Sequence, residues 1–224
     1  MKTATLSEIV EHGTSSRAWH ETLEVLFSLA KIDWYVSDLL TQRRSEGEAS
    51  LYTMLLSVAQ NIRDSARYLE IGVRKGFSLA IFAHECPTAH ITGIDLWEDE
   101  YAGQDNPGPA FVRKQLATAG HRGTSSLLEG DSHKILPNLS GLAFDCITVD
   151  GDHTEEGALS DLKWALTHVA PGGFILFDDI SNPAHLYLNE MWREHLGEHA
   201  DFDEWHYDET PNGIAIAQRQ RHDD

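Results

Sequence analysis

The sequence predicts an α/β fold in which a doubly wound, mostly parallel sheet of seven strands follows an N-terminal helical extension. Two observations support this prediction. From residue 67 onward, short apolar runs alternate with glycine-rich turns and amphipathic stretches, which is typical of strand–helix–strand crossovers. Near the end of the sequence, the turn signal Pro211-Asn212-Gly213 separates two further short runs. That arrangement indicates an antiparallel hairpin at the C-terminal end of the sheet.

Five expected strands come before the hairpin and alternate with helices. These strands cover 68–71, 90–94, 126–128, 144–149 and 174–177, and the hairpin strands cover 202–207 and 214–217. Helices are expected at 77–84, 109–119, 155–169 and 183–196. In the third of these helices one face carries Ala158, Leu162, Ala165, Leu166 and Val169, so that face should pack on the sheet.

Residues 1–64 are expected to form the helical extension, and residues 65–224 the main domain. Ser45 and Glu48 have the spacing of a capping box ahead of an apolar stripe at 51–62, and a second stripe runs from Trp19 to Ala30. The extension, which also contains Trp34 and Tyr35, would serve as a lid over a substrate pocket or as a contact in a homodimer. The segment 97–108 is equally open between a substrate-facing lid and a solvated acidic loop.

Charge and composition argue against polyanionic partners. The 224 residues include 36 acidic and 17 basic side chains, for a formal net charge of −19, and the basic residues form no stripe. A surface this negative repels nucleic acid and anionic lipid headgroups. No apolar run has the length of a membrane span, and the first residues lack the apolar core of a signal peptide. Two isolated cysteines, Cys86 and Cys146, indicate reduced thiols and a cytoplasmic location.

A glycine loop follows the first expected strand. Its pattern is Glu70-x-Gly72-x-x-x-Gly76-x-Ser78, which lacks two of the three glycines that a dinucleotide fingerprint requires. Glycine here lets the backbone turn tightly and lets a ligand approach without a Cβ in the way. Asp95 ends the next strand, 23 residues past Gly72. A carboxylate at that strand end is placed to accept both hydroxyls of a ribose.

The third strand also ends in polar residues. Glu129-Gly130-Asp131-Ser132 follows it, and there a carboxylate and adjacent backbone amides can hydrogen-bond an adenine edge. Three consecutive strands therefore end in ligand-type residues at the carboxyl edge of the sheet, where open α/β sheets bind their ligands.

These motifs resemble the class I S-adenosylmethionine-dependent methyltransferases, which have a Rossmann-like fold. The resemblance covers residues 67 to 217. It implies that Gly72 and Gly76 lie beneath the methionine part of S-adenosylmethionine, with Asp95 on the ribose. Glu70 would support the glycine loop and, through water, the amino group. The cofactor-binding residues that the resemblance implies are Glu70, Gly72, Gly76, Ser78, Asp95, Leu96, Asp131, Ser132 and Asp150.

Carboxylates follow the fourth and fifth strands as well. Asp150 ends one strand, and Asp178 and Asp179 end the next, 28 residues further on. A crossover of that length places the two strand ends side by side. Three carboxylates packed at one sheet edge repel one another unless a cation lies between them. Oxygen ligation with open positions indicates Mg²⁺, or another divalent cation such as Mn²⁺ or Ca²⁺.

This second pattern resembles the metal-dependent O-methyltransferases. In catechol O-methyltransferase the first metal aspartate is followed three residues later by the general base, and an acid–amide pair ends the next strand. His153 stands at that third position here, in the run Asp150-Gly151-Asp152-His153, which is more similar to the macrocin and mycinamicin sugar O-methyltransferases. The resemblance implies His153 as general base and Asp150 as its catalytic partner. An imidazole takes up a proton near neutral pH.

Three functions are compatible with these motifs. The first is a metal-assisted O-methyltransferase that acts on a hydroxyl of a small molecule, either a sugar moiety or a phenolic natural-product acceptor. The second is a metal-independent N- or C-methyltransferase of the same fold. The third is a non-catalytic protein that binds S-adenosylmethionine. The sequence does not encode the identity of the acceptor.

Overall fold

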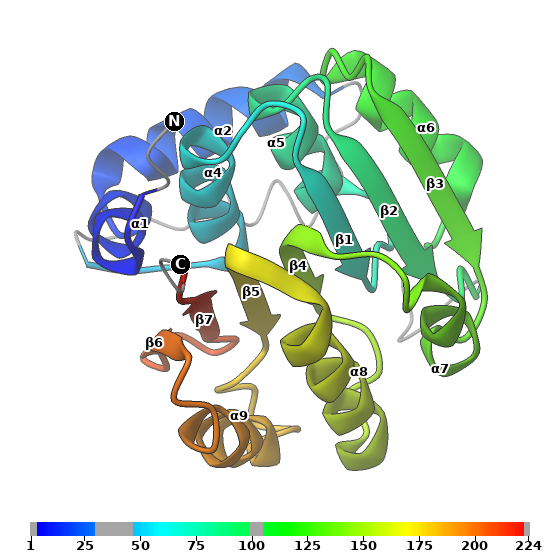
Figure 1. The fold of residues 1–224 in the computed structure, drawn as a ribbon. Coiled ribbons are helices and arrows are strands. Elements are labelled where there is room, and N and C mark those ends of the chain that lie inside the picture. The colour runs from blue at the N-terminus through cyan, green and yellow to red at the C-terminus, as the bar shows by residue number, and fades with distance from the viewer. Residues whose placement is uncertain (1–3, 30–46, 99–104, 222–224) are drawn as a thin grey trace.

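The computed structural model describes residues 4–29, 47–98 and 105–221. Its centre is a seven-stranded sheet with the order β3-β2-β1-β4-β5-β7-β6 (Figure 1). The strands are β1 (Arg67–Ile71), β2 (His90–Asp95), β3 (Thr124–Glu129), β4 (Phe144–Val149), β5 (Val169–Asp178), β6 (Phe202–Tyr207) and β7 (Ile214–Arg219). The first five are parallel, and β7 is antiparallel to both β5 and β6. The predicted fold class, with its C-terminal hairpin, is confirmed.

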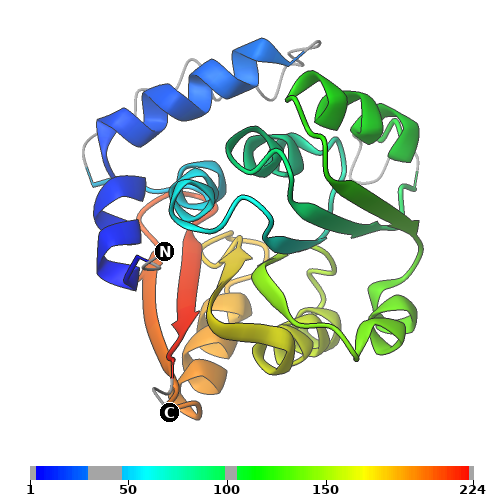
Figure 2. The same cartoon turned by 45° about the horizontal axis from the view of Figure 1, so that its top comes forward.

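Helices cover both faces of the sheet (Figure 2). One core lies under α1 (Leu6–Gly13), α2 (Ser16–Ser28), α4 (Leu51–Asn61), α5 (Phe77–Glu85) and α6 (Pro109–Thr118). The second core lies under α8 (Glu155–His168) and α9 (Tyr187–Gly197), next to the short α7 (Ser132–Ile135) and the 3-10 turn Leu136–Leu139. Successive strand residues alternate between these cores: Tyr68 belongs to the first and Leu69 to the second. This alternation follows from the two-residue period of a strand.

The strand order reverses between β1 and β4. β1 pairs with β2 on one side and with β4 on the other, so the crossovers that leave these strands diverge at this point. In open α/β sheets the ligand crevice lies outside the carboxyl ends of the strands at such a switch point. The predicted site residues that follow β1 and β4 therefore meet where a ligand is expected.

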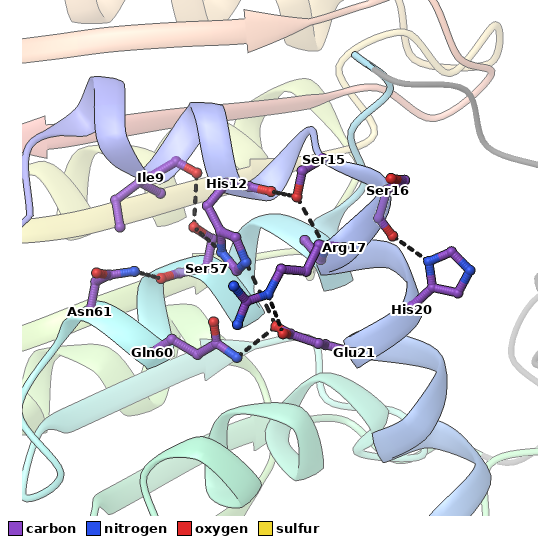
Figure 3. Close-up of polar contacts among 11 residues, drawn as sticks. Ile9, His12, Ser15, Ser16, Arg17, His20, Glu21, Ser57, Gln60 and Asn61 are labelled. Carbon is purple, nitrogen blue, oxygen red and sulfur yellow. Dashed lines mark hydrogen bonds and ion pairs between the residues drawn. The ribbon is translucent and has the colours of Figure 1, made fainter.

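The N-terminal helices α1 and α2 are joined to α4 by polar contacts (Figure 3). The Ser57 hydroxyl on α4 donates to the carbonyl oxygen of Ile9 on α1, at 2.8 Å, and lies 3.1 Å from His12 Nδ1. On α2, Glu21 accepts a hydrogen bond from Gln60 Nε2 of α4, at 2.9 Å, and forms an ion pair with Arg17. α1 and α2 are thus fixed to the rest of the fold through α4. The division at residues 64 and 65 stays a prediction.

Some element boundaries differ from those expected. The N-cap of α4 is Ser50, whose hydroxyl accepts from the Thr53 amide. The Thr53 hydroxyl in turn accepts from the Ser50 amide. The predicted capping box at Ser45 and Glu48 is therefore wrong for this helix, because Glu48 precedes the cap. The segment at 183–186 is a turn rather than the first part of α9, and β5 begins at Val169. Ser45, Trp34 and Tyr35 lie outside the described residues.

Two further features bear on the predictions from composition. Cys86 and Cys146 are both buried and free. Within the described part of the chain, no helix has both the length and the apolar character that a membrane crossing requires.

Candidate functional site

The glycine loop between β1 and α5 is pressed against the exit of β4. Gly72 has a φ of +89°, and a Cβ on it would lie 1.9 Å from the Asp150 carbonyl oxygen. Gly76 caps α5 with a φ of +70°, and its Cβ would lie 2.7 Å from a methyl carbon of Val112. Both positions need glycine, because L side chains strongly disfavour this backbone region and no space exists for one. The loop therefore keeps a bare backbone toward the switch point.

Glu70 lies directly beneath this loop, at the end of β1, and is 1% exposed. The hydroxyls of Tyr68 and Ser78 each donate to its carboxyl group at 2.6 Å. Burial raises the pKa of Glu70 to about 8, against the opposing effect of these two hydrogen bonds. Since the Ser78 hydroxyl is directed to Glu70, both residues support the loop from below.

Asp95 at the end of β2 holds the glycine loop from the other side. Its Oδ2 accepts hydrogen bonds from the amides of Val73 and Arg74, at 2.8 and 2.7 Å, and its Oδ1 accepts from the amide of Trp97, at 2.5 Å. Leu96 is 49% exposed next to it. Trp97 is instead buried, and its indole N–H donates to the Arg74 carbonyl oxygen. The predicted ribose acceptor thus also sets the conformation of the loop.

Asp131 and Ser132 open the short helix α7 after β3. Asp131 is the N-cap, and its carboxylate accepts from the His133 amide at 3.0 Å and pairs with Lys134 Nζ at 2.9 Å. The hydrogen bond from Lys134 is the main cause that lowers the pKa of Asp131. Ser132 Oγ donates to Asp161 Oδ2 at 3.3 Å. Both predicted adenine-side residues are therefore fixed at the carboxyl edge of the sheet.

Sequence reasoning missed Asp161, which is fully buried on α8. Its Oδ1 has no hydrogen-bond partner among the described residues, and burial raises its pKa to about 6. The signal was present: Asp161 lies three residues past Ala158 and four before Ala165, within the apolar face of the predicted helix. A charged residue in such a stripe marks a buried polar site.

Asp150, His153 and Asp179 meet beside the glycine loop. His153 Nε2 is 3.3 Å from Asp150 Oδ1, and His153 Nδ1 is 3.7 Å from Asp179 Oδ2. One ligand-type atom from each of the three residues lies within 4.8 Å of the others. Asp179 is 9% exposed, and its Oδ1 has no hydrogen-bond partner within the described ranges. A buried carboxylate oxygen without a donor is suited to a cation.

The pKa values of Asp150 and His153 are both raised in this cluster. Burial raises the pKa of Asp150, and the charge of Asp179 raises it further, while His153 opposes both. The hydrogen bond to Asp150 raises the pKa of His153 above its usual range, against the effect of burial. The imidazole thus lies between two carboxylates and can hold a proton in that position.

Asp178 does not belong to this cluster, although it was predicted as a ligand. It is the last residue of β5 and pairs with Ile214 of β7. Strand alternation places Asp178 on the same face as Leu176, toward α4 and α5. Asp179 leaves the strand with a φ of +61°, and this left-handed turn brings its carboxylate to His153. The cluster therefore contains His153 where the sequence suggested Asp178.

Known proteins resemble this chain in sequence and in fold. The sequence matches the family described as a methyltransferase domain over residues 69–180, a segment that includes every predicted site residue. The chain belongs to this family. Together with the fold, the match confirms the predicted class of S-adenosylmethionine-dependent methyltransferases. A search of curated protein sequences returned no match.

Solved structures show how widely the fold of this methyltransferase is shared. The O-methyltransferase TomG from Streptomyces achromogenes, involved in tomaymycin synthesis and solved with SAM, has a TM-score of 0.62 at 20% identity, covering 94% of this chain and 99% of its own. The calicheamicin methyltransferase CalS11 has a TM-score of 0.56 at 21% identity, and the match covers 92% of this chain and 93% of CalS11. A putative rRNA methylase from Clostridium thermocellum has a TM-score of 0.60 at 16% identity, and the match covers 77% of this chain and 98% of that protein. At these identities the likeness establishes the fold alone.

Two further residues of the methyltransferase contact His153, and the sequence did not predict them. His185 packs its ring against that of His153, with the centroids 5.1 Å apart, and the Tyr187 hydroxyl donates to the His153 carbonyl oxygen. Both belong to the segment between β5 and the first turn of α9. They are more than 30 positions away from His153 in the sequence, and no local pattern connects them to it.

Proposed function

We propose that this methyltransferase transfers the methyl group of S-adenosylmethionine to a hydroxyl oxygen of a small molecule, with the help of a divalent cation. The observation that supports this proposal most directly is the cluster of Asp150, His153 and Asp179 beside the glycine loop. A methyltransferase that only placed its two substrates together would have no need of a buried carboxylate and an imidazole at that edge.

The proposed binding site for S-adenosylmethionine is supported by the contacts of the glycine loop. Gly72 and Gly76 would leave room for the methionine part, and Asp95 would accept from the ribose while it holds the loop amides. The exposed Leu96 would pack on the adenine. The remaining residues proposed for this site are Glu70, Ser78, Asp131, Ser132 and Asp150, of which Glu70 and Ser78 act from beneath the loop.

The cation would be held by Asp150 and Asp179, whose oxygen donors suit Mg²⁺. When bound, a divalent ion lowers the pKa of a nearby hydroxyl and stabilises the negative charge that develops on its oxygen. Asp178 stays in the proposal as a further ligand to be tested. No other group of three or more ligand-type side chains was found among the described residues.

His153 would act as the general base. Its imidazole lies between two carboxylates, which stabilise the imidazolium that forms when the ring accepts the hydroxyl proton. Asp150 would orient the ring through the contact with Nε2. The chain itself therefore provides a proton acceptor and the charge that balances it.

A small-molecule acceptor is favoured over RNA. TomG is described as involved in tomaymycin synthesis and CalS11 as a calicheamicin methyltransferase, whereas the Clostridium protein is described as a putative rRNA methylase. The net charge of −19 argues against an RNA substrate for this chain, because phosphate backbones would be repelled. A sugar or phenolic hydroxyl of a natural product is the acceptor that we propose.

The test is a panel of catechols, flavonoids, glycosides and sugar-bearing macrolides, assayed for methyl transfer with and without chelator. We expect activity on a hydroxylated member that is lost with EDTA and restored by Mg²⁺. Activity that is indifferent to EDTA would instead favour a metal-independent enzyme. Binding of S-adenosylhomocysteine without turnover of any acceptor would favour a binding protein.

Metal binding is also measurable without turnover. Electron paramagnetic resonance can report the dissociation constant of Mn²⁺ for the wild type and for Asp150→Asn, Asp178→Asn and Asp179→Asn. We expect the first and third substitutions to weaken binding at least tenfold. Unchanged affinity in both would contradict the proposed site, and a loss in Asp178→Asn would add that residue to it.

A further inference from the structure

Two loops that leave neighbouring strands are joined beside His153. Val149 at the end of β4 pairs with Phe177 near the end of β5, so the segments that follow start next to each other. One carries Asp150 and His153, and the other runs from Asp179 to the start of α9 at Tyr187. The contacts between these segments decide how the His153 imidazole is held.

The Tyr187 hydroxyl connects them. It donates its proton to the carbonyl oxygen of His153, and the same hydroxyl lies 3.1 Å from His185 Nδ1. A hydroxyl has one proton to give. Since that proton is directed to His153, His185 Nδ1 must be the donor in the second contact. These contacts therefore favour the tautomer of His185 that carries its proton on Nδ1.

The rings add a second contact. The centroid of the His185 ring is 5.1 Å from that of His153, with 55° between the planes, and 5.9 Å from that of Tyr187, with 76°. His185 thus packs against the His153 ring while its Nδ1 reaches the hydroxyl. The imidazole of His153 is confined from this direction as well as through its main chain.

Asn182 closes the arrangement. Its side-chain amide donates to Asp179 Oδ2 at 3.2 Å. Its main-chain carbonyl oxygen accepts from the main-chain amide of His185 at 2.8 Å. With the contact of 3.7 Å between His153 Nδ1 and Asp179 Oδ2, the chain forms a closed ring of contacts. In order, this ring passes through Asp179, Asn182, His185, Tyr187 and His153.

We propose that Tyr187 and His185 are positioning residues for methyl transfer, which hold the His153 imidazole between Asp150 and Asp179. This inference rests on the proposed role of His153 as general base. Neither residue needs to touch the cofactor or the acceptor, because the main-chain contact at His153 and the ring contact both act on the base itself. Their removal should slow the proton transfer and leave cofactor binding intact.

The first experiment reads the proton position without turnover. In ¹⁵N-labelled protein, imidazole ¹⁵N shifts distinguish the two neutral tautomers of His185 at a pH where it is uncharged. We expect the Nδ1–H form in the wild type and a shift toward the Nε2–H form in Tyr187→Phe, where the acceptor is lost. The Nε2–H form in the wild type, or no change in the variant, would overturn this clamp, which consists of the contacts of Tyr187 and His185 with His153.

The second experiment is a double-mutant cycle on the best acceptor of the panel. Tyr187→Phe should lower kcat five- to tenfold, about the effect of one hydrogen bond, with unchanged affinity for S-adenosylhomocysteine by calorimetry. The double variant His153→Ala/Tyr187→Phe should be no slower than His153→Ala, because the clamp acts only through the imidazole. Additive losses, or wild-type kcat in Tyr187→Phe, would contradict the proposal.

A conservative pair and a remote control complete the design. His185→Asn keeps an N–H donor at the position of Nδ1 and should retain more activity than His185→Ala, and equal losses would contradict the hydrogen-bond role. Thr118→Ala removes a hydroxyl on α6 that donates to the Lys114 carbonyl oxygen and should leave kcat unchanged. If His153→Ala keeps the full rate, the proposed base is wrong, whereas the tautomer of His185 still tests the clamp independently.

Discussion

The carbonyl oxygen of Asp150 occupies the space that a side chain on Gly72 would need. An ideal Cβ at position 72 would lie 1.9 Å from that oxygen and 2.8 Å from the amide nitrogen of Gly151. The amide of Asp150 in turn donates to the Ile71 carbonyl oxygen at 2.8 Å. The exits of β1 and β4 are therefore in direct backbone contact, so the glycine loop and the cluster of Asp150, His153 and Asp179 are coupled through the main chain.

Gly72→Ala should damage both halves of the site. The methyl group would collide with backbone, which cannot rotate away as a side chain can, at a φ of +89° that alanine disfavours. We expect a loss of about 1–3 kcal/mol in the free energy of unfolding and a large loss of affinity for S-adenosylhomocysteine. Urea denaturation and calorimetry measure these two effects. Gly141→Ala, where nothing lies within 4 Å, is the matched control, and equal behaviour of the two variants would contradict the expectation.

Asp95→Ala should weaken cofactor binding at least tenfold. Its carboxylate accepts from three backbone amides, and a hydrogen bond to a charged group contributes about 1.5–3 kcal/mol. The substitution would therefore disturb the loop and remove the ribose acceptor that we propose. Titration calorimetry with S-adenosylhomocysteine is the measurement. Asp64→Ala removes a carboxylate that accepts from the Thr88 amide and should not change the affinity. An unchanged affinity in Asp95→Ala would remove this residue from the site.

Glu70 should make the protein less stable as the pH rises. Its pKa is about 8 in the fold and about 4.3 in an unfolded chain, so the fold favours the protonated carboxyl. The stability from this group is complete below the unfolded pKa and is lost as the pH rises through the folded pKa. Urea denaturation of the cofactor-free protein between pH 5 and 9 should therefore give a falling free energy of unfolding. In Glu70→Gln that fall should be smaller, and identical curves for the two proteins would show that Glu70 is not responsible.

His153→Ala should reduce the rate of methyl transfer by about 10²–10⁴-fold, as is typical for loss of a general base. In the wild type the rate should fall as the pH drops through the pKa of the imidazole, because the protonated ring cannot accept a proton. The variant should lack this acid limb. An aliphatic, sugar-like acceptor is needed, because a catechol can ionise without a base. His195→Ala on α9 is the control, and the same acid limb in wild type and His153→Ala would assign the base to another group.

The fold was predictable because it depends on local signals. Alternating apolar runs and glycine turns predicted all seven strands and most helices. A strand inside a parallel sheet is covered by helices on both faces, and it therefore appears in the sequence as a continuous apolar run. Boundaries that depend on tertiary contacts were not predictable. β5 continues back through Pro171 to Val169, where that residue pairs with Phe144 across an irregularity in the register, and no sequence pattern announces such a pairing.

The site was predictable as far as it follows strand ends. Residues directly after a strand are placed by the topology of the sheet, and for this reason the sequence predicts that Asp150 and Asp179 lie close together, as they do. Asp178 shows the limit of the argument, because neighbouring positions at a strand end point to opposite faces unless the backbone turns. His185 and Tyr187 were missed because they reach His153 through the fold, from a different loop.

The left-handed backbone at Asp179 restricts what evolution and mutagenesis can place there. Of the twenty residues, glycine, asparagine and aspartate adopt a φ near +61° most readily, and only the last two bring an oxygen to the cluster. Among related chains that share this turn, we expect position 179 to vary between aspartate and asparagine. For the same reason Asp179→Asn isolates the contribution of the negative charge, whereas Asp179→Ala would combine the loss of a ligand with strain in the main chain.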